Sequence, residues 1–227
     1  MNFYMYLKKE YGENEAIFVK DIVFEEYSKP WIKKELSKLC KEGKLTRYDK
    51  GIYYIPTKTL LGKSILDYKK VLMKKYIENG NAIFGYFSGI TFLNMLGLST
   101  QMPNKLEIYT NNETANIREV TVGGKDVILR RARTDITRQN ASVLSFLELM
   151  NYTDADFYDT EKVKIITDFI KEQKITRSQI TQYAPYYPDK ALRTLVESGI
   201  IYHVAQWYED AIQTLQAIVD SGLLDEM

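Results

Sequence analysis

The 227-residue sequence contains few of the residues on which several classes of site and scaffold depend. It has one cysteine, Cys40, and one histidine, His203, so an internal disulfide is excluded and a structural zinc site is not expected. It has five prolines, and no apolar run approaches the roughly 18 residues of a transmembrane helix. The N-terminus also lacks the layout of a secretory signal peptide. We therefore expect a protein of the reducing cytoplasm that does not span a membrane.

The sequence also lacks the usual motifs of catalysis. There is no glycine-rich phosphate loop and no cluster of Asp and Glu, which argues against ATPase, kinase or nuclease chemistry. Cys40 falls on an apolar helix stripe with no histidine near it in sequence, so we interpret it as a small core residue. We expect no enzymatic activity, no cofactor and no metal. The alternative is a nucleic-acid-modifying activity that uses Glu107 and Asp126, which lie on neighbouring predicted strands.

Charge is distributed unevenly along the chain, although the net charge is only +1. Residues 1–58 carry +3, residues 59–150 carry +4 and residues 151–227 carry −6. The most basic stretch is residues 28–58, with 9 Lys or Arg against 3 Asp or Glu. This asymmetry indicates an anion-facing N-terminal part and a different role for the acidic C-terminal part.

The first 58 residues have the element order of a winged helix-turn-helix. We expect a short helix in "FYMYLKKEYG", a brief strand in "AIFV" and a second helix in "KDIVFEEYS". Pro30 suits the first turn of a third helix, for which Ser28 is a plausible cap, and Gly43 ends that helix. "LTRYDKGIYYIP" then predicts a hairpin, with Asp-Lys-Gly in a type I turn closed by a glycine bulge.

The third helix has two distinct faces. Its apolar residues recur at i, i+4, i+7 and i+8 and form one buried stripe: Ile32, Leu36, Leu39 and Cys40. At 100° per residue the opposite arc is polar and basic, with Trp31 at its edge: Lys34, Ser37, Lys38 and Lys41.

This arrangement predicts a DNA-binding helix with an adjoining wing. A helix fits the major groove and a β-ribbon reaches the backbone or the minor groove, where lysines and hydroxyls neutralise phosphates. The alternative is an ordinary solvated helix face. The helix face lacks Arg, Asn and Gln, so the target sequence cannot be deduced. The expected DNA contacts are Lys29, Trp31, Lys34, Ser37, Lys38, Lys41, Arg47, Tyr48 and Lys50.

Residues 59–150 predict a compact α+β domain, and residues 151–227 predict a helical region. We expect a long helix in "LLGKSILDYKKVLMKKYIENG" and strands in "AIFGYF" and "KLEIYT" around a short helix. "REVTVGGKDVILRRA" predicts a hairpin with the glycine pair in its turn, and "TRQNASVLSFLELM" predicts a helix capped by Thr137. The expected fold class is therefore α+β, with a small antiparallel sheet in the middle domain.

Several arginines of the middle domain could form a second basic surface that contacts phosphates. The alternative is a set of ordinary surface ion pairs. The residues concerned are Arg118, Arg130, Arg131, Arg133 and Arg138.

The segments "GYFSGITFLNMLGLSTQMPNKLEIYTNN", "REVTVGGKDVILRRA" and "ITRQN" resemble those of AbiEi-like antitoxins from bacterial type IV toxin–antitoxin systems. The N-terminal winged-helix segment is similar to that of the same family, and together the matches cover about residues 1–150. The resemblance implies a repressor that binds inverted repeats in the promoter of its own operon. It also implies a counterpart, a nucleotidyltransferase-like toxin that is countered without a stable complex. The long acidic C-terminal part departs from the pattern. Two alternatives are a winged-helix protein-interaction module and a stand-alone regulator without a toxin.

Overall fold

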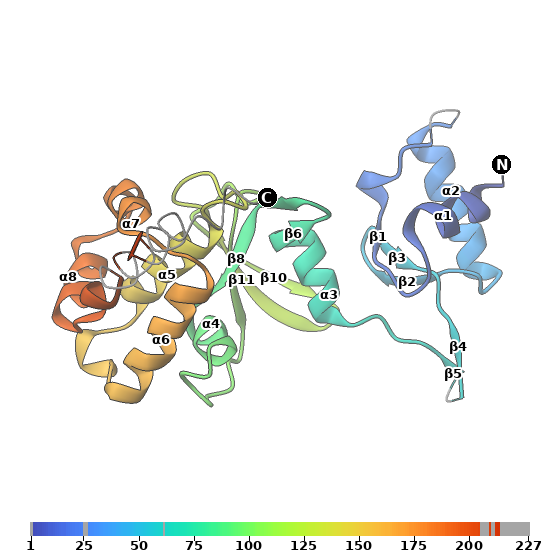
Figure 1. The fold of residues 1–227 in the computed structure, drawn as a ribbon. Helices are drawn as coiled ribbons and strands as arrows, with labels where there is room; N and C mark the ends of the chain where they lie inside the picture. The colour runs from blue at the N-terminus through green and yellow to red at the C-terminus, as the bar shows by residue number, and fades with distance from the viewer. Residues whose placement is uncertain (1, 25–26, 61, 205–208, 210–211, 214–227) are drawn as a thin grey trace, which may run out of the picture. The chain divides into compact units, whose positions relative to one another are not determined.

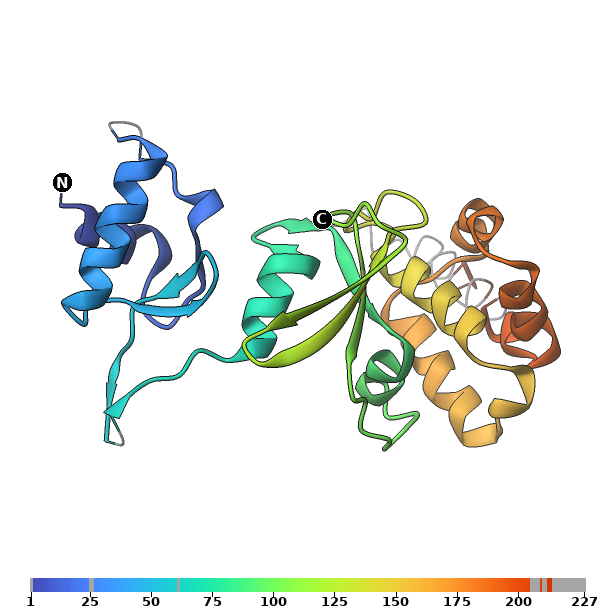
Figure 2. The same cartoon turned by 180° about the vertical axis from the view of Figure 1, so that it is seen from behind.

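The computed structural model describes residues 2–24, 27–60, 62–204, 209 and 212–213. The chain has a mixed α+β architecture (Figures 1 and 2). It divides into two compact units. One contains Met1–Lys75 together with Thr121–Lys125, and the other contains Tyr76–Val120 and Asp126–Met227. We call these the N-terminal unit and the C-terminal unit.

In the first part of the N-terminal unit, residues 3–54, helices α1 and α2 pack on a three-stranded antiparallel sheet of order β1-β3-β2. The core lies between them and includes Phe3, Leu7, Ile17, Leu36 and Ile55. The elements in chain order are α1 (Phe3–Tyr11), β1 (Ile17–Phe18), the 3₁₀ turn η1 (Val19–Asp21), α2 (Lys29–Lys41), β2 (Thr46–Asp49) and β3 (Ile52–Tyr54).

The expected second helix over "KDIVFEEYS" is not present in the described part of that segment. Only the 3₁₀ turn Val19–Asp21 forms, and the chain is extended at Ile22. Residues 25–26 lie outside the described part of the chain. β-Branched Val19, Ile22 and Val23 disfavour a helix here, and Phe24 and Tyr27 instead stack their rings on each other.

The prediction of a long helix over residues 60–80 is also wrong for the first half of that segment. A small antiparallel hairpin comes first, formed by β4 (Lys58–Thr59) and β5 (Gly62–Lys63). Helix α3 (Tyr68–Leu72) begins only after Asp67, whose side chain accepts a hydrogen bond from the Lys69 N–H, and it continues as a π-helical turn, Met73–Ile77. Gly62 explains the break, because it has a φ of 117° that other residues rarely adopt.

The C-terminal unit is built on a four-stranded sheet of order β10-β11-β9-β8. The sheet is mixed, because β9 and β11 run parallel while β8 and β9 run antiparallel. The expected small antiparallel sheet is therefore present only in part. β10, the hairpin neighbour of β11, occupies the edge, and β11 lies parallel to β9. The strands are β8 (Gly85–Ser88), β9 (Leu106–Thr110), β10 (Ile117–Val122) and β11 (Lys125–Arg131), and a separate two-stranded ribbon comprises β6 (Glu78–Asn79) and β7 (Ala82–Ile83).

Helices cover this sheet and share one core with it. Helix α5 carries eight consecutive buried residues, from Val143 to Met150. It begins at Ala141 and not at Thr137, because the Asn140 side chain accepts the Thr137 N–H and holds the preceding turn. The helical elements are α4 (Gly89–Met95), α5 (Ala141–Tyr152), η3 (Ala155–Phe157), α6 (Thr160–Glu172), α7 (Arg177–Tyr183), η4 (Ala184–Tyr186) and α8 (Asp189–Glu197).

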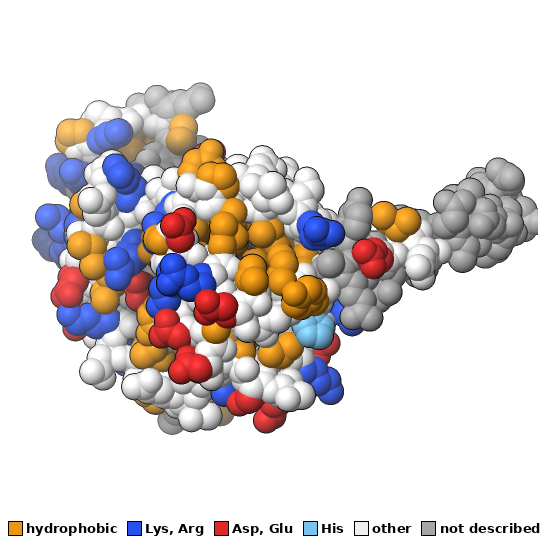
Figure 3. Space-filling model, turned by 90° about the vertical axis from the view of Figure 1, so that its left-hand side faces the viewer, with side chains coloured by type: hydrophobic (Ala, Val, Ile, Leu, Met, Phe, Trp, Pro, Cys, Tyr) orange, Lys and Arg blue, Asp and Glu red, His pale blue; other side chains and the backbone are white. Residues whose placement is uncertain are grey.

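The helical prediction for the C-terminal part agrees with the structure through residue 204. The rest of that prediction falls almost wholly outside the described residues. Figure 3 faces the side of α7 and α8 and shows hydrophobic side chains gathered there, with charged side chains beside them. Exposed apolar residues of this part of the chain include Tyr186, Val196 and Tyr202. None of the described helices is long and apolar enough to cross a membrane.

Candidate nucleic-acid interface

Helix α2 presents the two faces that its sequence predicts. Ile32, Leu36 and Leu39 are buried in the core of the N-terminal unit, and Cys40 is partly buried against it. The opposite side of the helix is exposed. It carries Lys34, Ser37, Lys38 and Lys41. Burial raises the pKa of the Cys40 thiol more than nearby Arg47 lowers it, so the thiol is held in its unreactive form.

The lysines of this face have few partners within the protein. Lys38 lies 3.6 Å from Glu35 in an exposed i,i+3 ion pair. An exposed pair of this kind stabilises a protein very little, so the ammonium group remains free to contact another anion. Among the described residues, Lys34 and Lys41 form no ion pair within 4.0 Å. Lys29 and Lys33, at the start of the helix, are exposed as well.

The C-terminal end of α2 is held by several contacts. Gly43 takes a left-handed φ of 71° and stops the helix, as predicted. The Lys63 ammonium donates to the Gly43 carbonyl at 3.0 Å, which satisfies one backbone acceptor at the helix end. A hydrogen bond between Lys44 and Glu42 raises the pKa of the lysine and lowers that of the carboxyl group.

The hairpin β2–β3 follows directly and turns at Lys50 and Gly51. Gly51 has a φ of 74° and forms the turn, as the sequence predicts. The register shift lies between Arg47 and Asp49, before the turn, and not at Gly51 where the glycine bulge was predicted. Arg47 and Lys50 are exposed, and the Arg47 Nε donates to the Asp49 carbonyl at 3.3 Å. Tyr48 is half-buried, and burial raises the pKa of its hydroxyl.

Trp31 has a packing role that the sequence analysis did not assign. Its ring stacks on Tyr27 at 3.8 Å between centroids and meets Phe3 edge-on at 5.4 Å. Phe24 and Tyr6 belong to the same aromatic cluster. Packing alone therefore accounts for an aromatic residue at this position, and contact between Trp31 and DNA stays a prediction.

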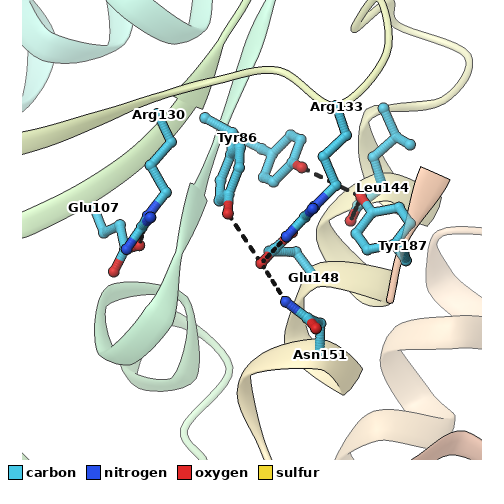
Figure 4. Close-up of polar contacts among 9 residues, drawn as sticks. Tyr86, Glu107, Arg130, Arg133, Leu144, Glu148, Asn151 and Tyr187 are labelled. Atoms are coloured by element: carbon cyan, nitrogen blue, oxygen red, sulfur yellow. Dashed lines mark hydrogen bonds and ion pairs between the residues drawn. The ribbon is translucent and has the colours of Figure 1, made fainter. Parts of the chain in front are cut away.

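The five arginines expected to form a second basic surface are mostly engaged by acidic side chains. Arg118 pairs with Glu113 at 2.7 Å. Arg130 pairs with Glu107, and Arg133 pairs with Glu148 at 2.8 Å (Figure 4). The Arg138 Nε donates to the Asn81 carbonyl at 3.2 Å. Arg131 is exposed and forms no ion pair with the described residues. These contacts favour the alternative of paired charges for three of the five.

Glu148 is the centre of a polar network inside the C-terminal unit (Figure 4). Its carboxylate accepts hydrogen bonds from Arg133, from the Tyr109 hydroxyl at 3.1 Å and from the Asn151 amide at 3.0 Å. The Arg133 guanidinium also lies over the Tyr187 ring, 5.1 Å from its centroid. Burial lowers the pKa of Arg133, but the hydrogen bond and charge of Glu148 raise it more. The guanidinium of Arg133 therefore keeps its positive charge.

The residues of the enzymatic alternative do not gather into a metal cluster. Glu107 is engaged by Arg130, and its backbone N–H donates to the Thr91 hydroxyl at 3.4 Å. The hydrogen bond with Glu119 raises the pKa of Lys105, and the negative charge of Asp126 raises it further. Within the part of the chain that the structure describes, no three His, Cys, Asp or Glu residues are placed to hold a metal ion.

Comparison with known proteins places the chain in a family. Residues 7–178 match the family of unknown function DUF6088. The chain belongs to the DUF6088 family. The match spans more than half of the sequence and includes both α2 with its hairpin and the mixed sheet. A search of curated proteins found no match for this DUF6088 member.

Proposed function

We propose that this protein is a DNA-binding transcriptional repressor that acts in the cytoplasm and also serves as a type IV antitoxin of the AbiEi-like kind. The DNA-binding part is supported by one observation above all: the exposed, largely unpaired lysine face of α2 lies immediately before the hairpin that carries Arg47 and Lys50. The order α1, β1, α2, β2, β3 with the sheet β1-β3-β2 is consistent with a winged helix-turn-helix whose second helix is reduced to the turn Val19–Asp21.

In this proposal α2 lies in the major groove and the β2–β3 hairpin braces on the backbone. Lys34, Lys38 and Lys41 neutralise phosphates, and Ser37 donates a hydrogen bond to a phosphate or to a base edge. Because the lysine contacts are to the phosphate backbone, the part of the affinity that they supply is strongly salt-dependent and does not vary with base sequence. Inverted repeats in the promoter of its own gene are the expected target.

The test replaces Lys34 and Lys38 together by alanine and measures binding to a duplex taken from upstream of the protein's own gene. We expect weaker binding to all duplexes and a fall of about 2 in the slope of log affinity against log salt. The matched control replaces Lys164 and Lys171, two exposed lysines of α6. Binding that is unchanged in the Lys34/Lys38 variant would refute the assignment and favour a protein-interaction module.

The antitoxin part rests on the resemblance to AbiEi-like proteins and has its own test. The counterpart would be a nucleotidyltransferase-like toxin encoded beside this gene, and the two proteins would form no stable complex. Co-expression should restore growth to cells that make the toxin. The Lys34/Lys38 variant should still restore growth, since antitoxin activity is assigned to the region beyond residue 58. Failure of the wild type to restore growth would leave a stand-alone regulator.

A further inference from the structure

The β4–β5 ribbon, in which Lys58–Thr59 pairs with Gly62–Lys63, is a small hairpin that the sequence analysis did not predict; residue 61 lies outside the described part of the chain. Lys58 and Lys63 face each other across it, and Leu60 at its tip is fully exposed. Both ribbon views show it projecting from the body formed by α1, α2 and β1–β3 (Figures 1 and 2). Leu60 has no core to join, so packing gives no reason for an apolar residue there.

The base of the ribbon is fixed firmly to the N-terminal unit. The Ser64 N–H donates to the Thr57 carbonyl at 3.0 Å, which extends the hairpin by one pair. The Asn14 amide donates to the Thr57 hydroxyl at 2.8 Å, and the Asn14 side chain also contacts the Ser64 hydroxyl. The Tyr54 hydroxyl donates to the Ser64 carbonyl at 2.9 Å. The ribbon is therefore held in place at its base by hydrogen bonds that involve four side chains.

The ribbon is also anchored to the end of the candidate DNA-reading helix. The bond from Lys63 to the Gly43 carbonyl joins it to the residues that follow Lys41, the last residue of α2. Lys63 is thereby occupied in positioning the ribbon. Lys58, on the facing strand, is exposed and forms no ion pair with the described residues.

The charge of this segment suits an anionic partner, of which a nucleic-acid backbone is the one that fits the proposed function of α2. Between Asp49 and Asp67 the sequence contains Lys50, Lys58 and Lys63 and no acidic residue. Within this stretch of sequence the charged side chains are therefore all cationic, although Asp49 borders it at the hairpin turn. Apolar side chains such as leucine, presented beside cations, are used by proteins to enter the minor groove and open base steps.

We propose that the β4–β5 ribbon is a second DNA contact of the N-terminal unit. Lys58 binds a phosphate, and Leu60 enters the minor groove next to the major groove occupied by α2. This inference rests on the proposed DNA-binding function and adds to it a bend or local opening of the duplex. Lys63 acts as a positioning residue that joins the ribbon to the end of α2.

The experiment uses the full chain and a fluorescently labelled duplex from upstream of its own gene. Leu60→Ala should weaken binding about 3- to 30-fold while leaving the salt slope unchanged. Lys58→Ala should lower that slope by about 1. The matched control is Ile65→Ala, which removes an exposed apolar side chain just outside the ribbon and should leave both quantities unchanged. Energy transfer between dyes at the two duplex ends should report less bending with Leu60→Ala than with the wild type.

The outcomes separate this inference from the proposal on which it rests. If the wild type does not bind the duplex, the DNA-binding function fails. If the wild type binds but Leu60→Ala and Lys58→Ala both behave as Ile65→Ala does, only the ribbon inference is overturned. It is also overturned if sedimentation shows that Leu60→Ala abolishes self-association while DNA affinity per protomer is unchanged. In that case the tip contacts protein. Because Leu60 is fully exposed, none of these variants should lower the melting temperature.

Discussion

Arg133 and Glu148 form a largely buried ion pair, with 2.8 Å between the guanidinium Nε and the carboxylate, although 15 residues separate them in sequence. The pair connects the end of the mixed sheet to α5, and Tyr109 and Asn151 complete the hydrogen bonding of the carboxylate. A surface made for phosphates would leave this guanidinium free. The network therefore assigns Arg133 to the architecture of the C-terminal unit.

Removal of the Glu148 side chain should lower the free energy of unfolding more than removal of an exposed acidic side chain does. Glu148→Ala leaves a largely buried guanidinium without its counter-charge, so the free energy of unfolding should fall by about 3 kcal/mol. The control is Glu119→Ala, which breaks the exposed pair with Lys105 and should change stability by less than about 1 kcal/mol. Urea denaturation measures both values. Equal losses in the two variants would show that the Glu148 network does not stabilise the fold.

Alkaline pH should weaken the C-terminal unit through its buried tyrosines. Burial, followed by the charge of Glu148, raises the pKa of Tyr109 to about 12, against 10 for the exposed side chain. Its contribution is fully present below pH 10 and is lost as pH rises through about 12, since only the unfolded state releases the proton readily. Unfolding free energies at pH 9 and pH 11.5 should differ less in Tyr109→Phe than in the wild type. The difference should be on the order of 2 kcal/mol. An identical pH dependence in the two proteins would contradict this assignment.

Truncation of a side chain on the buried face of α2 should lower stability, whereas truncation on the exposed face should weaken DNA binding. Leu36 is fully buried, and Leu36→Ala should lower the free energy of unfolding by about 2–5 kcal/mol. Its neighbour Ser37 is exposed, and Ser37→Ala should leave stability nearly unchanged while weakening DNA binding. Thermal melting followed by circular dichroism tests the first effect, and a mobility-shift titration tests the second. A large loss of stability in Ser37→Ala would place that side chain in the core.

Trp31 can be tested for packing and for DNA contact separately. Trp31→Ala removes the ring that stacks on Tyr27 and should lower the free energy of unfolding by about 3 kcal/mol. Trp31→Phe keeps an aromatic ring in the cluster and should recover much of that loss. If DNA affinity falls in Trp31→Phe while stability holds, the indole itself contacts DNA. Equal affinity in Trp31→Phe and the wild type would assign the residue to packing alone.

Arg131 offers the test of the second basic surface. Its side chain is exposed and has no acidic partner among the described residues, whereas Arg118, Arg130 and Arg133 are paired with glutamates. If this surface contacts nucleic acid, Arg131→Ala should lower the salt slope of DNA binding by about 1. Lys105→Ala, on the exposed pair with Glu119, is the control. An unchanged slope would confine DNA binding to the N-terminal unit.

The sequence determined the features that depend on local spacing. The 3.6-residue period of Ile32, Leu36 and Leu39 defined the buried face of α2 and therefore its exposed lysines. Glycines at 43 and 51 marked the helix end and the hairpin turn, because only glycine takes a positive φ without strain.

Tertiary structure alone decided what depends on distant partners. The glutamate partner of Arg130 is 23 residues away in sequence and that of Arg133 is 15, and neither pairing has a local signal. The parallel pairing of β9 with β11 likewise joins strands that are distant in sequence, and no local pattern predicts it. Gly62 allows the β4–β5 ribbon, and Asn14, far from it in sequence, holds its base by a hydrogen bond to Thr57. A helical pattern with one glycine could not predict that choice, because the free energy that decides it comes from contacts made only in the folded chain.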